Sequence, residues 1–305
     1  MYPIFQKLFS YFFVLTISGS LVITGFTYNV IKKFTQRPVY SQARKQEIEQ
    51  NRNLLLEQFH AQPIRFKTED GLELSGLFFL REGAQRNVLI CHGFRMAKER
   101  LILFVSMFAN DNILLFDHRA HGESEGTRVT LGFDEKRDVL AALNVFLKEE
   151  KTRELPIYGI GLSMGAVSLL GAAAENPIFK GIVLDSPFAR LDLQARRTIE
   201  RKYKLIYSPF EPLGKLVFYY VMHFSPEEVN ALAWAEKIQM PVLMIHSMQD
   251  RTALFDDAQQ IYANMKGKKE LWAVDGSKHA RIFIDFQDDY CQKVNQFFNA
   301  SLLVS

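Results

Sequence analysis

Cysteine is scarce in this chain of 305 residues, which contains only Cys91 and Cys291. Two cysteines exclude a disulfide framework and a cysteine-based zinc site. A large excess of one charge is also missing, because 37 basic residues nearly balance 34 acidic ones and leave a formal net charge of +3. This balance gives no reason to expect a nucleic-acid partner. Hydrophobic residues make up 48% of the chain, an ordinary share that excludes extensive disorder and a polytopic membrane protein.

An apolar run near the N-terminus departs from this ordinary composition. No side chain from Leu8 to Ile31 carries a charge. A helix of this length would span about 36 Å, enough to cross a hydrocarbon core of about 30 Å. The run predicts a single-pass membrane anchor within residues 1–37. A buried core helix remains an alternative, as does a cleaved signal peptide, although the run exceeds the usual apolar core of about 7–15 residues and no small-residue cleavage site follows it.

The charges that flank the run give it an orientation. Lys7 precedes the run, whereas Lys32, Lys33 and Arg37 follow it. The positive-inside rule then places the downstream part of the chain on the cytoplasmic side of the membrane. Residues 38–61 are mostly polar, with one narrow apolar stripe that predicts a linker helix.

Short apolar runs alternate with helical patterns over residues 62–300. The runs are typical of strands buried on both faces of a parallel sheet, and lie at Ile64–Lys67, Leu72–Leu80, Val88–Cys91, Ile113–Asp117, Ile157–Gly161, Ile182–Asp185, Val242–His246 and Leu271–Val274. Helical patterns cover Lys98–Ala109, Phe133–Glu150, Met164–Glu175, Ala253–Met265 and Phe286–Asn299. This alternation predicts an α/β fold with a doubly wound, mostly parallel sheet. Residues 190–237 lack a strand pattern and predict a helical cap inserted between two strands.

Ser163 is the predicted nucleophile. It is the centre of the pentapeptide Gly-Leu-Ser-Met-Gly at 161–165, which follows an apolar strand and precedes a helix of small residues. That context is required of a nucleophile elbow. Gly161 and Gly165 would remove side chains that clash with the neighbouring strand and helix, and the helix N-terminus favours a developing negative charge. The alternative is a serine that only caps a helix.

A serine nucleophile needs a base, and the base needs an orienting acid. His279 lies just past the last predicted strand and is the candidate base. Asp250 lies past the preceding strand and is the candidate acid, which would hold the imidazole tautomer and stabilise the imidazolium. Its alternative role is a helix cap. Asp185, at the end of the strand before that, is the reserve acid.

The tetrahedral intermediate of acyl transfer needs two hydrogen-bond donors. The backbone amides of Met164 and Phe94 are the predicted oxyanion hole. Gly93 lets the loop before Phe94 turn tightly, and His92 is predicted to support that loop by hydrogen bonding. No residue pattern predicts a bound metal, and Cys91 is predicted to be a buried strand residue rather than a reactive thiolate.

Together these motifs resemble the α/β-hydrolase superfamily, in particular its serine-aminopeptidase-like and monoglyceride-lipase-like branch. The resemblance covers about residues 62–300 and is carried by Cys-His-Gly-Phe at 91–94, Asp-His-Arg-Ala-His-Gly-Glu-Ser-Glu-Gly at 117–126, the pentapeptide at 161–165, Leu-Asp-Ser-Pro-Phe at 184–188, Asp250 and His279. It implies a Ser–His–Asp triad, no cofactor, and hydrolysis of ester, thioester or amide bonds. The chain departs from the family at Ala120, where glycine is common, and at Ala253-Leu254, where Val-Pro is common.

The sequence thus predicts a membrane-anchored serine hydrolase of carboxylic esters, with a small acyl or lipid ester as substrate and membrane lipid as partner. It leaves the oligomeric state open. A serine peptidase or amidase is the alternative enzyme, although a peptidase that captures a free N-terminus needs acidic groups, and residues 196–204 of the cap are mostly basic. A catalytically idle membrane scaffold is the alternative from another class.

Overall fold

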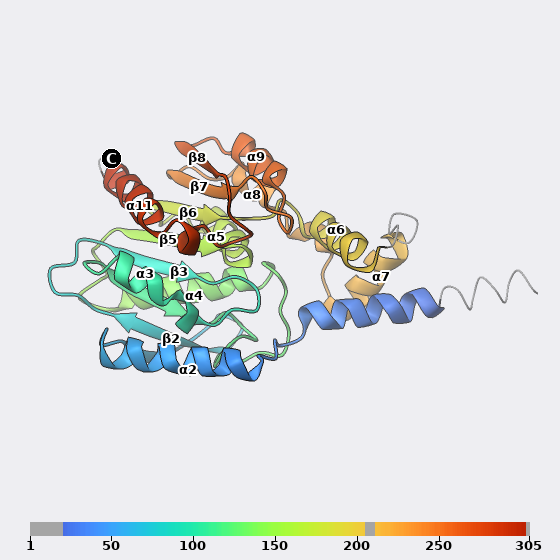
Figure 1. Ribbon diagram of the computed structural model, residues 1–305, viewed down its shortest axis with the longest axis horizontal. Helices are drawn as coiled ribbons and strands as arrows, with labels where there is room; N and C mark the ends of the chain where they lie inside the picture. Colours follow the sequence, from blue (N-terminus) through green and yellow to red (C-terminus); the bar gives the residue numbers. More distant parts are fainter. Residues whose placement is uncertain (1–20, 205–210, 303–305) are drawn as a thin grey trace, which may run out of the picture.

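An eight-stranded sheet forms the centre of the computed structural model, which describes residues 21–204 and 211–302 (Figure 1). The strand order is β1-β2-β4-β3-β5-β6-β7-β8. Only β2 runs against its neighbours β1 and β4; the other pairs are parallel. The strands span Gln62–Lys67 (β1), Glu73–Phe79 (β2), Asn87–Cys91 (β3), Asn112–Phe116 (β4), Ile157–Leu162 (β5), Gly181–Asp185 (β6), Val242–Ser247 (β7) and Lys269–Val274 (β8). The predicted α/β class and all eight predicted strands are confirmed.

Two apolar cores cover the two faces of this sheet, because successive side chains of a strand point to opposite faces. Leu89 and Leu114 belong to one core, and their neighbours Ile90 and Leu115 belong to the other. On the first face pack α4 (Glu135–Lys148), α5 (Met164–Glu175), α8 (Ala231–Ala235) and α9 (Phe255–Asn264). On the second face pack α2 (Gln42–Glu57), η1 (Lys98–Leu101), α3 (Ile102–Met107), α10 (Ile282–Asp285) and α11 (Gln287–Leu302).

The predicted cap lies between β6 and β7 and is helical where it is described. It contains α6 (Leu191–Tyr203), α7 (Glu211–Met222) and the short helix η3 (Pro226–Glu228). Both α6 and α7 lie to one side of the sheet, next to the N-terminal helix (Figure 1). Phe218 and Met222 of α7 join Leu191 of α6 in a third apolar cluster, which also includes Ile31 of the N-terminal helix.

The N-terminal helix is described from residue 21 to residue 35. Residues 8–20 of the predicted anchor lie outside the described residues. Leu21 and Val22 are 67% and 72% exposed, whereas Thr27 and Ile31 are at most 8% exposed. Across the two described ranges, no helix combines the length and apolarity that a membrane crossing requires. One face of the last part of the apolar run is covered by protein, because a 3.6-residue period turns Thr27 and Ile31 to the same side of the helix, whereas Tyr28 is 46% exposed.

The predicted linker helix also packs against the body of the protein. α2 begins after Ser41, whose side chain accepts a hydrogen bond from the amide of Arg44. Leu55 of α2 is fully buried in the second core. Arg52 forms an ion pair with Glu123 in the loop after β4. α2 therefore packs on the domain that contains the sheet, as well as connecting this domain to the N-terminal helix.

Candidate active site

Ser163, Asp250 and His279 come together at one edge of the sheet. Ser163 follows β5, Asp250 follows β7 and His279 follows β8. The carboxyl ends of parallel strands share one edge, where ligands bind in open α/β sheets. The structure thus brings the three residues together from positions far apart in the sequence.

Ser163 has a backbone conformation that few side chains adopt, with φ 52° and ψ −113°. Its amide donates to the carbonyl of Asp185 at 2.8 Å. A Cβ atom at Gly161 would lie 2.5 Å from Cα of Ala166, and one at Gly165 would lie 2.3 Å from the carbonyl oxygen of Cys91. Only glycine fits at both positions, so the pentapeptide builds a strained turn that presents the serine side chain.

A chain of hydrogen bonds links the three side chains. Oγ of Ser163 lies 2.8 Å from Nε2 of His279, and Nδ1 of His279 lies 2.6 Å from Oδ2 of Asp250. With its proton on Nδ1, the imidazole donates to the carboxylate and leaves Nε2 free to accept from the serine hydroxyl. Ser163 occupies the N-cap position of α5, but its side chain makes no capping hydrogen bond.

Asp250 is held in place as an acceptor. Its side chain is fully buried, and its Oδ1 accepts hydrogen bonds from the amides of Thr252 and Ala253 at 2.7 and 3.1 Å. It does not cap α9, whose N-cap residue is Leu254. These two amides fix the carboxylate so that Oδ2 faces the imidazole.

Asp185, the reserve acid, lies in a different environment. Its side chain is completely buried, and its Oδ1 accepts a hydrogen bond from the hydroxyl of Ser186 at 2.8 Å. Burial raises the pKa of Asp185 to about 7. Among the hydrogen bonds of the described residues, none joins Asp185 to His279, so the orienting contact comes from Asp250.

Two unpaired amides lie beside Ser163. Met164 is the first residue of α5, so its amide has no partner four residues earlier. Neither this amide nor that of Phe94 donates a hydrogen bond within the part of the chain that the structure describes. Both residues line the same cavity as Ser163 and His279. The two amides are therefore free to donate to a ligand.

His92 and Gly93 shape the loop that carries Phe94. The His92 ring is fully buried; its Nδ1 donates to the carbonyl of Gly93 at 2.8 Å and its Nε2 accepts from the amide of His118 at 3.0 Å. Burial holds the pKa of His92 well below its usual range, so the ring stays neutral. A Cβ atom at Gly93 would lie 3.3 Å from the carbonyl oxygen of Leu162, so this loop runs close to the end of β5.

The segment 117–126 carries buried ion pairs whose partners the sequence did not predict. Nζ of Lys98 lies 2.8 Å from Oδ2 of Asp117, and both side chains are buried. Arg119 binds the buried Asp138 in the same way. A Cβ atom at Gly122 would overlap the Asp117 carboxylate, at 2.1 Å from Oδ2. Ala120, where the family commonly has glycine, adopts φ 56° in the left-handed region.

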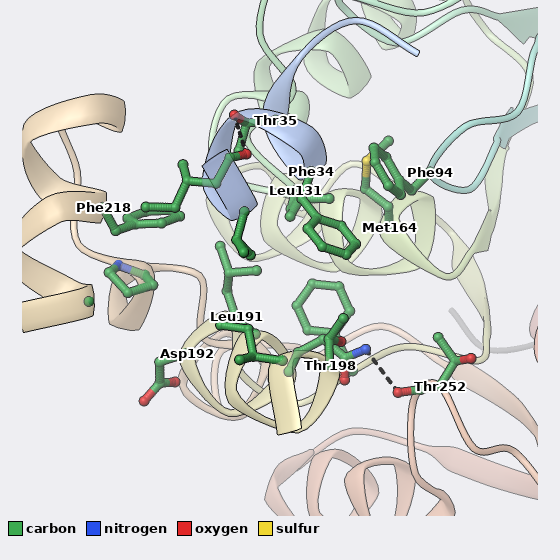
Figure 2. A pocket seen from close by; sticks show the side chains of 18 of the residues that line it. Phe34, Thr35, Phe94, Leu131, Met164, Leu191, Asp192, Thr198, Phe218 and Thr252 are labelled. Carbon is green, nitrogen blue, oxygen red and sulfur yellow. Dashed lines mark hydrogen bonds between the residues drawn. The ribbon is translucent and has the colours of Figure 1, made fainter. Parts of the chain in front are cut away.

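A cavity of about 300 Å³ adjoins Ser163 and His279. It is mostly apolar, and its lining includes Phe94, Leu131, Met164, Leu191 and Phe218; Figure 2 shows Phe94 and Met164 at the opposite end from Phe218. Five residues of the N-terminal helix also line it: Thr27, Val30, Ile31, Phe34 and Thr35. None of these five residues was predicted from the sequence to line the site. Thr27, Ile31 and Thr35 recur at helical spacing, a pattern that could have indicated a protein-packed face.

The described residues offer no cluster of three or more His, Cys, Asp or Glu side chains that could hold a metal ion. Cys91 is buried in β3, and burial raises the pKa of its thiol well above the ordinary range. A thiol in this environment stays protonated and is a poor nucleophile.

Comparisons with known proteins agree with this architecture. A family model described as serine aminopeptidase, S33, matches residues 82–217. The uncharacterized protein YqkD of Bacillus subtilis is 29% identical over 75% of this chain and 76% of its own length. Monoglyceride lipase of Rattus norvegicus is 30% identical over 37% of this chain and 38% of its own.

A solved esterase structure from Pyrococcus furiosus shares the fold. It superposes with a TM-score of 0.67 at 24% identity and covers 87% of this chain and 96% of its own. This likeness is one of architecture. The chain thus has the α/β-hydrolase fold, and the proteins to which it is similar support a place in the α/β-hydrolase superfamily.

Proposed function

We propose that the protein is a serine hydrolase that cleaves carboxylic esters through a covalent acyl-enzyme. The observation that carries the proposal is the hydrogen-bonded chain from Ser163 through His279 to Asp250, with the serine on a strained turn. A serine hydroxyl becomes a useful nucleophile only when a base accepts its proton. The proposed roles are nucleophile for Ser163, base for His279 and orienting acid for Asp250.

In the first half of the reaction, Oγ of Ser163 attacks the acyl carbon while Nε2 of His279 accepts the hydroxyl proton. The buried Asp250 stabilises the imidazolium that forms and keeps the ring in the required orientation. The carbonyl oxygen of the substrate gains negative charge, and the unpaired amides of Phe94 and Met164 donate to it. His279 then gives the proton to the leaving alcohol, which departs.

In the second half, water takes the place of the alcohol. Nε2 of His279 accepts a proton from the water as its oxygen attacks the acyl carbon, and the same two amides hold the second oxyanion. Collapse of this intermediate releases the carboxylic acid and returns the proton to Oγ of Ser163. The cycle consumes one ester and one water, and it uses no cofactor.

The cavity supports an ester rather than a peptide as substrate. Its two acidic lining residues are already paired, Asp192 with Arg190 at 2.7 Å and Glu211 with Lys215 at 2.9 Å. Neither carboxylate is free to bind the amino terminus of a peptide. The similarity to a monoglyceride lipase and to an esterase agrees with an acyl or lipid ester, and a thioester has the same acyl half.

We also propose that the chain is tethered to a membrane, with its hydrolase domain on the cytoplasmic side. The uncharged run that begins at Leu8 supports this proposal, as do the basic residues that follow it. Removal of residues 2–20 tests the tether. We expect the full chain in the membrane pellet and the shortened chain in the supernatant; equal recovery of both in the pellet would contradict the proposal.

The activity is tested with a fluorophosphonate probe on membranes that contain the full chain. We expect labelling of the protein that Ser163→Ala removes, followed by turnover of esters in a panel of matched ester, thioester and amide substrates. Faster cleavage of the amide would make the protein a peptidase or amidase. A folded protein that neither labels nor turns over any member of the panel would be a catalytically idle scaffold.

A further inference from the structure

The cavity beside Ser163 is not formed by the hydrolase domain alone. We propose that the N-terminal helix is a wall of the acyl-binding site, and that its residues Val30 and Ile31 determine which acyl chains the enzyme accepts. This inference rests on the proposed ester hydrolase function. It assigns a substrate-binding role to a helix that the sequence predicts only as a membrane anchor.

The N-terminal helix turns a buried face toward the cavity. Thr27, Val30, Ile31 and Thr35 are 4–8% exposed, and all four line the cavity. Earlier in the same helix, Leu21 and Val22 are mostly exposed. Figure 2 shows Thr35 and Phe34 on the opposite side of the cavity from Leu191 and Thr198 of α6. The helix therefore closes a space that α6 and α7 would otherwise leave open.

The end of the helix is fixed to the hydrolase domain. The carbonyl oxygen of Thr35 accepts from the amide of Val129 at 2.6 Å. The guanidinium of Arg37 donates to the carbonyl oxygens of Gly122 and Gly126 at 2.7 and 3.2 Å. These bonds hold the helix on the loop that follows β4. A loose tether would not make repeated backbone contacts of this kind.

The helix is also held on the cap. The Phe26 ring packs edge-on against Tyr203 of α6, with centroids 5.1 Å apart. Nζ of Lys202 lies 5.1 Å from the centroid of the Phe34 ring. The N-terminal helix thus contacts both the hydrolase domain and the cap, and these contacts fix its position beside the cavity.

The chemistry of the cavity indicates an acyl chain. The hydroxyl of Thr35 donates its proton to the carbonyl of Ile31 at 2.8 Å, so this proton is not available to a ligand. Leu191 and Ile199 of α6 and Phe218 of α7 also line the cavity. A volume of about 300 Å³ lies at the small end of the range for ligand pockets, roughly 300–1,000 Å³. The site therefore fits one hydrocarbon chain whose ester group reaches Ser163.

Two substitutions of opposite effect test the wall. In the full-length protein, Val30→Phe fills the cavity and Ile31→Ala enlarges it. Val22→Phe is the matched control, because it also replaces a valine by phenylalanine but at a position that is 72% exposed. The measurement is kcat/KM for p-nitrophenyl esters from acetate to dodecanoate. We expect Val30→Phe to lower the ratio of decanoate to acetate turnover by about tenfold, Ile31→Ala to move the optimum toward longer chains, and Val22→Phe to leave the profile unchanged.

The dependence of kcat/KM on acyl-chain length decides whether the N-terminal helix is a wall of the acyl site. If neither Val30→Phe nor Ile31→Ala changes it, the N-terminal helix is not a wall of the acyl site. If Val22→Phe changes it as much as Val30→Phe, the effect arises outside the cavity and the inference also fails. Thermal unfolding of each variant identifies a loss of folding, and Ile31→Ala keeps the inference testable if Val30→Phe does not fold.

A binding measurement separates this inference from the proposed function. The Ser163→Ala protein is titrated with cis-parinaric acid, a fluorescent fatty acid, with and without Val30→Phe. We expect the second substitution to weaken binding by about tenfold. If Val30→Phe weakens fatty-acid binding but the wild-type protein cleaves no ester, the acyl site is retained and the proposed hydrolase function is overturned. Ester cleavage by the wild type, with binding that is the same with and without Val30→Phe, would retain the hydrolase and overturn the wall.

Discussion

Oγ of Ser163 lies 2.8 Å from Nε2 of His279, although 116 residues separate them in the chain. We expect Ser163→Ala to remove fluorophosphonate labelling and to lower ester kcat by at least about 10³-fold, because the members of such a unit act together. Ser168→Ala is the matched control; its hydroxyl donates only to the carbonyl of Met164 in the same helix. Turnover above about one percent of wild type in Ser163→Ala would require another nucleophile.

The two buried aspartates near His279 should differ in their effect on catalysis. Asp250 accepts from Nδ1 of His279 at 2.6 Å, whereas Oδ1 of Asp185 accepts from Ser186. We expect Asp250→Asn to lower kcat by about 10⁴-fold, because an amide favours the wrong imidazole tautomer. Asp185→Asn should cost far less. Steady-state kinetics on both variants decides the assignment, and a larger loss in Asp185→Asn would move the orienting acid to the end of β6.

Asp185 should also make stability depend on pH. Burial raises its folded pKa from 3.8 to about 7, so between these values the folded state holds a proton that the unfolded state has lost. The stability that this group contributes is present below pH 3.8 and declines as the pH rises toward 7. We therefore compare the free energy of unfolding of Asp185→Asn with that of wild type. We expect this difference to shift in favour of Asp185→Asn by on the order of 2 kcal/mol as the pH rises from 5 to 8.

Urea unfolding of wild type and Asp185→Asn at the two pH values measures this difference. Asp285→Asn serves as a control, because the hydrogen bond from Arg281 holds the pKa of Asp285 below its usual range and the carboxyl is ionised in both states at the two pH values. Its stability relative to wild type should therefore be the same at pH 5 and pH 8. A difference between wild type and Asp185→Asn that stays constant with pH would show that Asp185 does not titrate in this range.

The strands from β3 to β7 were predictable because each is a short run buried on both faces, as Val88, Leu89 and Ile90 illustrate. The grouping of Ser163, Asp250 and His279 followed from a topological rule, since residues after parallel strands meet at one edge. Their hydrogen bonds could not be derived in this way. Oδ2 of Asp250 faces the imidazole because two backbone amides hold Oδ1, a detail of loop geometry that residue spacing does not encode.

The N-terminal helix was only partly predictable. Hydrophobicity identified an apolar run, but lipid and protein both bury apolar side chains, so the run alone did not show that residues 27–35 would contact the cap. Likewise, the order of charges along the sequence does not pair Lys98 with Asp117. Only the fold brings Nζ of Lys98 to 2.8 Å from Oδ2 of Asp117. Buried ion pairs and walls shared between distant segments depend on tertiary structure, which local patterns do not contain.

Gly165 of α5 lies directly against the backbone at the end of β3. A Cβ atom at Gly165 would lie 2.3 Å from the carbonyl oxygen of Cys91 and 2.6 Å from that of His92. Gly165→Ala would push α5 away from β3 and carry the Met164 amide with it. We expect a loss of at least about 1–3 kcal/mol in stability, typical of overpacking, together with a large fall in kcat.

Gly25→Ala is the matched control for this substitution. Gly25 lies in the N-terminal helix, and a Cβ atom there would meet no atom within 4 Å. Alanine in a helix is favoured over glycine by up to about 1 kcal/mol, so this change should leave stability equal or higher. Thermal unfolding and ester kinetics on both variants provide the test. A Gly165→Ala protein with the stability and kcat of Gly25→Ala would show that α5 and β3 can separate without disturbing the oxyanion donors, and the close approach would then have no part in positioning Met164.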